Sequence, residues 1–456
     1  MNATRRLAGL AALAALCLAL GAAGPIAQAA GGQDQGAKQP YTMAEYNSYK
    51  ACADDKVPAS LIRCLDDFVS KYPNSALLQY VYPLYYQAYG AQKNYAKVIE
   101  NADKLIAIGD KLDAATRSQT LLQAYNIREG AWTTLPAAEQ TAGAAAARDA
   151  ASAALKVLDS IKKPDNVSDA DFQKSKLPYI VFFNNTGAQA AVRLKDFNGA
   201  LAFYKAILAV NADEPATEYN MGKAYLDMAP PQTMDGYWHI AKAITSKTAT
   251  DAQKKQLTPY LKKLIIAYQG GTVCDSLTDS EFNELLQLAG SSADRPESYK
   301  LLSSADLDAA RKDMTIASVI TDLKAGGDKA KVTWFASCGL EFPDVPGKLF
   351  EVIAPATDTD PVILKIAFVT SQAEFDAATA PDMEVKVVGQ PEAAKLNKDD
   401  NPAPRFTGTL ASYDPAPAFL LHWEKGKVNA DDLPKEKEKP VKKPPVRRPA
   451  HKKPSQ

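Results

Sequence analysis

The sequence predicts an α-solenoid, a row of helical hairpins stacked side by side, followed by a small all-β domain. Over residues 41–290, small and aromatic residues recur at spacings of three and four, as they do along one face of a helix. Short breaks divide this region into helix–break–helix units. After residue 348 the apolar residues recur at every second position, which is typical of β-strands. An irregular helical bundle is the alternative for the first region.

The N-terminus predicts export from the cytoplasm. Arg5 and Arg6 precede an almost wholly apolar stretch, which ends near an Ala-Gln-Ala triplet suited to cleavage. Residues 1–29 are therefore interpreted as a signal peptide and residues 30–40 as a flexible linker. The apolar stretch is short for a spanning helix, although an uncleaved anchor is the alternative. No later segment has the roughly 20 consecutive apolar residues that cross a bilayer, so we expect a periplasmic or secreted chain that is not transmembrane after cleavage.

Four cysteines remain after this cleavage, and an even number in an oxidising compartment favours disulfides. Cys52 and Cys64 lie six residues on either side of Pro58, which suits the turn of a helical hairpin. Positions equidistant from such a turn face each other, within reach of a disulfide. A bond between Cys274 and Cys338 would join the helical region to the second half of the chain. Inert buried thiols are the alternative, and zinc is disfavoured because no CxxC pair or neighbouring histidine accompanies them.

Three stretches of the helical region share one pattern. Residues 85–106, 186–207 and 220–244 each consist of an amphipathic run, a short break and a second amphipathic run. In the third stretch, Gly222 of the first run is followed by Gly236 in the second. A glycine inside a helix costs about 1 kcal/mol relative to alanine, and close approach of the second helix would compensate for that cost.

These units resemble the tetratricopeptide repeat, a helix–turn–helix unit of roughly 34 residues. The matching positions are Met221, Gly222 and Tyr225 in one unit, Asp196, Phe197 and Ala200 in the unit before it, and Tyr89, Asn94 and Tyr95 in an earlier one. Residues 61–75 resemble the second helix of a first unit, and residues 121–161 a divergent unit with an alanine-rich helix. The turn over residues 228–233 is longer than the family's usual turn. The resemblance covers residues 41–290, and the whole chain is similar to uncharacterised exported bacterial repeat proteins with a C-terminal β-rich domain.

The resemblance implies a concave groove lined by the first helix of each unit. By the usual phasing of the repeat, Asn185, Gln189, Arg193, Tyr219 and Lys223 point into it. Polar and aromatic side chains there suit protein or peptide partners, and the alternative is that they are ordinary helix-surface residues. The set does not reproduce the lysines and asparagines with which some family members grip a C-terminal carboxylate, so that ligand is not implied.

A run of tyrosines precedes these candidates, and one helix face cannot bury all of them, so some should line the groove or cap an exposed end. Core packing is favoured for Tyr85 and Tyr89. The run comprises Tyr80, Tyr82, Tyr85, Tyr86 and Tyr89.

The second half of the chain contains a helical linker segment, residues 291–345, with one helix predicted over residues 303–323. Residues 346–430 form the predicted β domain, with four or five short strands in a small barrel or sandwich of OB-like character. Residues 371–379 suit a short helix or a loop. The strands lack a clustered basic and aromatic face, which disfavours nucleic-acid binding and favours a structural or partner-binding module.

The formal net charge is zero, but the charges are distributed unevenly. Residues 435–456 carry nine Lys or Arg against two Glu, so an acidic body ends in a basic, proline-rich tail. We expect residues 431–456 to be disordered, because such a composition cannot bury a core. The tail would attract an anionic envelope polymer, lipid headgroups or an acidic protein; a solvated tail without a specific partner is the alternative.

The sequence contains no recognisable catalytic motif. It has three histidines, His239, His422 and His451, and lacks the HExxH, GxSxG, GxxxxGK[ST] and GxGxxG patterns. We therefore predict no cofactor and no metal, and we interpret His239 as a packed or rim residue. The adjacent acidic pairs, such as Asp399-Asp400, suit solvated surfaces.

The sequence thus predicts a non-enzymatic scaffold or adaptor in the cell envelope. One alternative is a hydrolase of envelope glycans that uses carboxylates alone, contributed by distant segments. The other is a β-domain ligand binder for which the repeats provide a platform.

Overall fold

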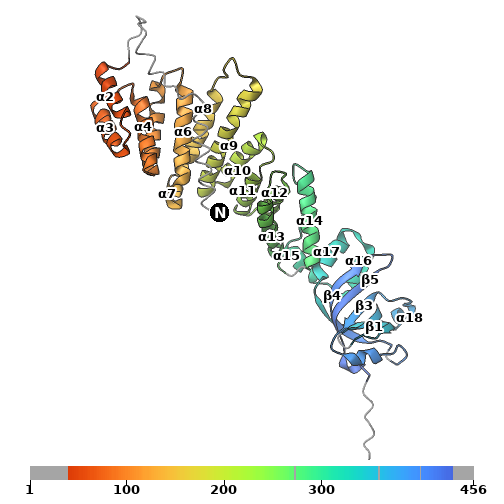
Figure 1. The fold of residues 1–456 in the computed structure, drawn as a ribbon. Coiled ribbons are helices and arrows are strands. Elements are labelled where there is room, and N and C mark those ends of the chain that lie inside the picture. Colours follow the sequence, from red (N-terminus) through yellow and green to blue (C-terminus); the bar gives the residue numbers. More distant parts are fainter. Residues whose placement is uncertain (1–39, 272–273, 358–359, 401, 435–456) are drawn as a thin grey trace, which may run out of the picture. The chain divides into compact units, whose positions relative to one another are not determined.

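The computed structural model describes residues 40–434, except 272–273, 358–359 and 401 (Figure 1). The signal peptide and residues 435–456 of the predicted tail fall outside these residues, as does all of the linker but its last position. Residues 431–434 of that tail are described, and Asp432 accepts a hydrogen bond from the backbone N–H of Arg405, so the predicted disorder does not begin at residue 431. The chain divides after Leu194 into two compact units, which are described separately. Within the described residues the chain is mostly helical and ends in a small closed β-barrel. No described helix is both long enough and apolar enough to cross a membrane.

Unit 1 consists of helices that pack against their neighbours in sequence. Thr42 caps the first helix with a capping box, Pro58 begins the second, and the Asn94 side chain accepts a hydrogen bond from the backbone N–H of Lys97 at the start of the fourth. The elements are α2 Met43–Ala53, α3 Pro58–Lys71, α4 Leu78–Ala91, α5 Tyr95–Ala107, η2 Gly109–Lys111, α6 Arg117–Thr134, α7 Ala137–Ala142, α8 Ala144–Ser160 and α9 Asp169–Arg193.

The first hairpin has the predicted disulfide. Cys52 of α2 and Cys64 of α3 are bonded, with their Cα atoms 5.4 Å apart. The bond lies beside a core that includes Leu65 and Phe68 of α3 and Val81 of α4. The hairpin is therefore held both by the covalent bond and by apolar burial.

The tyrosines of α4 divide between the core and the surface. Tyr82, Tyr85 and Tyr86 are buried, whereas Tyr80 and Tyr89 remain partly exposed. The Tyr85 hydroxyl donates a hydrogen bond to Asp66 at 2.6 Å, which satisfies its polar atom. Three of the five rings on α4 are thus buried in the core. The ring of Tyr89 stacks on the ring of Tyr85, with the ring centroids 6.1 Å apart.

Unit 2 begins with a second series of helices. From α10 to α14, each helix packs on the next one in the sequence, and α12 also packs on α14. The elements are α10 Phe197–Val210, α11 Pro215–Leu226, α12 Thr233–Thr245, α13 Asp251–Tyr268, α14 Asp275–Ser291, α15 Ser304–Arg311, α16 Ile316–Ala325 and α17 Gly327–Ser337.

The single helix predicted over residues 303–323 is two helices. Ser303 caps α15, and Thr315 starts α16 with a capping box of its own, so the chain breaks between them. Gly326, at φ +73°, ends α16, and α17 follows directly. The end of α16 lies close to the predicted end at residue 323, whereas the capping residue Thr315 marks a helix start that the prediction omits.

The C-terminal domain is a closed barrel in the order β1-β2-β3-β5-β4, in which β3 and β5 are parallel and the other pairs are antiparallel. Alternate strand residues point inward, and α16 packs Val319 and Leu323 against the same core. The elements are β1 Glu341–Ile353, β2 Val362–Phe368, α18 Gln372–Ala377, β3 Met383–Val387, η3 Pro391–Lys395, β4 Arg405–Asp414, β5 Leu420–Val428 and η4 Ala430–Asp432. The first strand starts before the predicted boundary, because Pro343 and Pro346 conceal its alternation.

Candidate functional site

The α11–α12 hairpin is built around two glycines. A Cβ added to Gly222 would lie 2.7 Å from the carbonyl oxygen of Gly236 and 2.7 Å from Cγ1 of Ile240. The backbones of the two helices therefore touch, as the spacing of small residues predicted. This contact fixes α11 and the outward direction of its side chains.

Two of the predicted groove residues lie on α11, one helical turn apart. Lys223 is exposed, and Tyr219 is partly buried against Tyr260 of α13, edge to face with ring centroids 6.2 Å apart. Burial raises the pKa of Tyr260 and the Tyr219 ring adds to this, whereas the nearby Lys223 charge lowers it. We name this surface, Tyr219, Lys223 and Tyr260, the α11–α13 face.

Tyr260 was not among the sequence candidates. Tyr260 lies in the middle of α13, where its ring meets that of Tyr219 on α11, and an aromatic residue within that predicted helical region was the available signal. The predicted solenoid included the residues of α13, but none of them was assigned to a position of the repeat, because polar residues dominate the first half of this helix. The α11–α13 face combines two aromatic rings with one exposed cation.

The other predicted groove residues lie on α9 in unit 1. Gln189 is exposed and Asn185 is partly buried. Arg193 donates a hydrogen bond from Nη2 to Oε1 of Gln140, and its guanidinium lies 6.0 Å from the ring centroid of Trp132. The Arg193 side chain is thus held by contacts within unit 1, whereas the Gln189 side chain is exposed to solvent.

Each described histidine contacts carboxylates. His239 Nδ1 lies 2.6 Å from Oε2 of Glu218, and the ring stacks on Tyr225 at 5.3 Å. His422 lies 3.0 Å from Asp414 and 3.3 Å from Glu384. Among the described residues, no serine, threonine or cysteine is hydrogen-bonded to either ring, so the described contacts assemble no nucleophile–base pair of the kind that acyl transfer uses.

Besides Glu218, two glutamates are buried among the described residues, one in each unit, and both have raised pKa values. Glu129 of α6 accepts a hydrogen bond from Arg128, and burial raises the pKa of its carboxyl to about 7. Glu281 of α14 accepts a hydrogen bond from the Gln269 amide, and burial likewise raises its pKa to about 7. Sequence reasoning missed both, and the available signal was a charged residue within the apolar face of a helix.

The comparisons add no family to these observations. Neither a protein-family model nor a curated protein matches this chain. In the part of the chain that the structure describes, no three His, Cys, Asp or Glu side chains are arranged to hold a metal ion. The α11–α13 face, the buried glutamates and the surface of the barrel are therefore assessed from their own chemistry.

Proposed function

We propose that this protein is an exported scaffold or adaptor, that its helical part is a solenoid of tetratricopeptide-like hairpins, and that it binds protein or peptide segments in the cell envelope. The two disulfides suit an oxidising, extracytoplasmic compartment. Helix pairs packed against their sequence neighbours in each unit suit a repeat architecture, whose first helices form a binding surface.

The observation that carries the proposal is the α11–α13 face. Tyrosine is enriched among the residues that dominate binding energy at interfaces, because its ring buries area at low entropic cost. Here two tyrosine rings hold each other in place, so less side-chain entropy is lost on binding. No ion pair of Lys223 is found among the described residues, so its ammonium is available to an acidic group of the partner.

The experiment is affinity capture from envelope extract. The triple variant Tyr219→Ala, Lys223→Ala, Tyr260→Ala removes the face, whereas the double variant Lys205→Ala, Lys247→Ala changes exposed lysines elsewhere in the same unit. Proteins enriched by the unmodified chain should be lost from the triple variant and retained by the double variant. Equal capture by all three chains contradicts the proposal, and circular dichroism confirms that each variant is folded.

A second candidate function is ligand binding by the barrel, with the repeats as a platform. The strand order and the parallel β3–β5 pair resemble the OB fold, whose members bind ligands on the outer face of strands 2 and 3. On that face, Lys365 lies 3.0 Å from Glu351 and opposite Glu384 in the strand register, and Glu384 contacts His422. This row of alternating charges suits a polar ligand with both signs of charge rather than a polyanion.

The two candidates are separated by one further variant. Lys365→Ala with His422→Ala disrupts the charge row and leaves the α11–α13 face intact. Loss of capture in this variant alone would favour the barrel as the binding module. Turnover of envelope glycan that one Asp or Glu substitution abolishes would instead establish the hydrolase alternative.

A further inference from the structure

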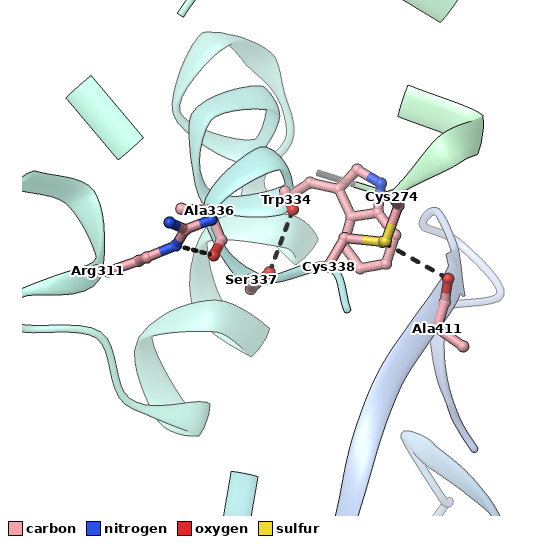
Figure 2. Close-up of a disulfide and its surroundings, with 7 residues drawn as sticks. All are labelled: Cys274, Arg311, Trp334, Ala336, Ser337, Cys338 and Ala411. Carbon is pink, nitrogen blue, oxygen red and sulfur yellow. Dashed lines mark hydrogen bonds between the residues drawn. A yellow bond between two sulfur atoms is a disulfide. The ribbon is translucent and has the colours of Figure 1, made fainter. Parts of the chain in front are cut away.

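The disulfide between Cys274 and Cys338 joins two parts of unit 2. Cys274 precedes the first turn of α14, where its carbonyl oxygen accepts hydrogen bonds from the N–H groups of Leu277 and Thr278. Cys338 follows α17, and its Cα lies 5.9 Å from that of Cys274. Figure 2 shows the bond between the end of α17 and the start of α14, with Ala411 of β4 beside it.

Cys338 is attached firmly to the barrel. The next residue, Gly339, donates a hydrogen bond to Leu410 of β4 at 2.8 Å, and Leu410 donates back to Leu340 at 3.1 Å. The preceding helix, α17, is fixed by Trp334, whose ring packs edge to face on Tyr413 at 4.9 Å. The disulfide thus connects α14, which packs on α12 and α13, directly to the barrel side.

The non-covalent seam around this bond is small. Its apolar cluster adjoins the barrel core through Met314 and Trp334, but α14 contributes only Leu277 to its buried part. The one ion pair between α14 and α17 among the described residues, Lys331 with Glu284 at 3.3 Å, is exposed and therefore weak. The buried members of the cluster are Leu277, Leu307, Phe335, Ala336 and Cys338.

Buried polar atoms on and around α14 add a free-energy cost to the closed arrangement. Oε1 of Gln269, Oγ1 of Thr278 and the hydroxyl of Tyr299 are buried without a hydrogen-bond partner among the described residues. The side-chain amide nitrogen of Gln269 donates a hydrogen bond to the carboxylate of the buried Glu281, so it does not compensate for the unpartnered Oε1. A buried polar atom without a partner costs free energy that contact with water would recover, so opening of the seam would relieve this cost.

We propose that the Cys274–Cys338 disulfide is a redox latch, which holds the start of α14 (the α14 junction) against α17 and the barrel and releases it on reduction by a dithiol. The covalent bond supplies the constraint that the small apolar seam and its unsatisfied polar atoms do not. The Cys52–Cys64 bond differs, because it lies within one hairpin beside a large core.

The two sulfurs differ in access, which sets the order of the reaction. Cys274 is partly exposed, whereas Cys338 is completely buried. A thiolate of the dithiol attacks Sγ of Cys274, a mixed disulfide forms, and Cys338 leaves as a thiolate that takes up a proton. The second thiol of the reductant then displaces Cys274, so two electrons and two protons pass to the protein and the reductant becomes a disulfide.

Hydrogen exchange of the full chain, with and without dithiothreitol, tests the latch. In a Cys52→Ser, Cys64→Ser background, where one disulfide remains, reduction should accelerate exchange of the Leu277, Thr278 and Gly339 amides roughly tenfold or more. Amides of β2, β3 and α12 should keep their protection. Re-oxidation should restore the slow rates.

A second variant tests the bias toward opening. Thr278→Val with Tyr299→Phe removes two unpartnered polar atoms, and it should slow junction exchange in the reduced protein relative to the reduced parent. The proposal is overturned if reduction leaves junction exchange unchanged. It is equally overturned if reduction removes protection from the whole chain, because the bond would then serve folding and not a local latch.

Discussion

Two helix contacts in unit 2 differ in how they are held together. At the α11–α12 contact, glycines allow the two backbones to touch. At the start of α14, nearby buried polar atoms have no partner among the described residues, and a disulfide supplies the connection to the barrel. The first contact is close-packed and cannot accept an added atom, whereas the second leaves buried polar atoms without a described partner. The difference teaches that stability is distributed unevenly within one compact unit, and that substitutions at the two places should act in opposite directions.

The largest expected effect is a pH dependence that originates at the junction. The folded pKa of Glu281 is about 7 and its ordinary value is 4.5, so between these pH values the folded chain holds a proton that the unfolded chain loses. The free energy of unfolding should therefore fall as pH rises from about 4.5 to 7, by up to about 3 kcal/mol, and level off above this window. Glu281→Gln should remove this contribution, as measured by urea unfolding across the pH range.

The matched control is Glu284→Gln, one helical turn further along α14 and more exposed. Because the Glu284 charge adds a small part to the raised pKa of Glu281, this variant should reduce the pH dependence slightly and leave most of it in place. Glu129 contributes a similar slope from unit 1, because its folded pKa is raised in the same direction, so Glu281→Gln should flatten the curve only in part. An unaltered curve in Glu281→Gln would show that the junction carboxyl is not buried in solution.

The second prediction concerns the close-packed contact. In Gly222→Ala the new Cβ meets a backbone oxygen of α12 at 2.7 Å, and that oxygen has no free rotation by which to move away. The clash should outweigh the gain of about 1 kcal/mol in helix propensity, giving a net loss of roughly 2 kcal/mol in unfolding free energy. Thermal denaturation of the variant measures this loss. A stability equal to that of the parent would mean that the two helices lie further apart than in the structure.

The third prediction returns to the junction. Tyr299→Phe removes a buried hydroxyl that has no partner among the described residues. The substitution keeps the ring and its apolar contacts, so the unfolding free energy should rise by about 1 kcal/mol. A destabilised variant would mean that the hydroxyl has a partner, such as an internal water.

The smallest effect sharpens the glycine comparison. Gly130 lies inside α6, and a Cβ there would meet nothing within 4 Å. Gly130→Ala should therefore raise the unfolding free energy by about 0.5–1 kcal/mol, through helix propensity alone. The opposite signs of Gly130→Ala and Gly222→Ala, measured under the same conditions, would separate propensity from packing.

The sequence predicted local features well. Alternation after residue 348 predicted four or five short strands, and the barrel has five, because a strand buried on one face repeats every two residues. Symmetric spacing about Pro58 predicted the first disulfide, and paired glycines predicted the α11–α12 contact. Each of these signals joins residues that are close together in the sequence.

Features that depend on distant pairing could not be predicted. The parallel pairing of β3 with β5 and the closure of the barrel have no local pattern. The burial of Glu129 and Glu281 depends on which neighbouring helices cover them, so a single chain gave no warning of their raised pKa values. At the candidate site, Tyr219 and Lys223 were named from repeat phasing, while Tyr260 was missed because the pattern of its helix is obscured by polar residues.

Site-specific photo-crosslinking in the cell envelope tests the adaptor claim most directly. A photoreactive amino acid replaces Lys223 on the α11–α13 face or, as the control, the exposed Lys205 of α10. The proposed function predicts discrete crosslinked partner bands from position 223 that are absent from position 205. Absence of crosslinks from position 223, or identical bands from both positions, would contradict binding at this face.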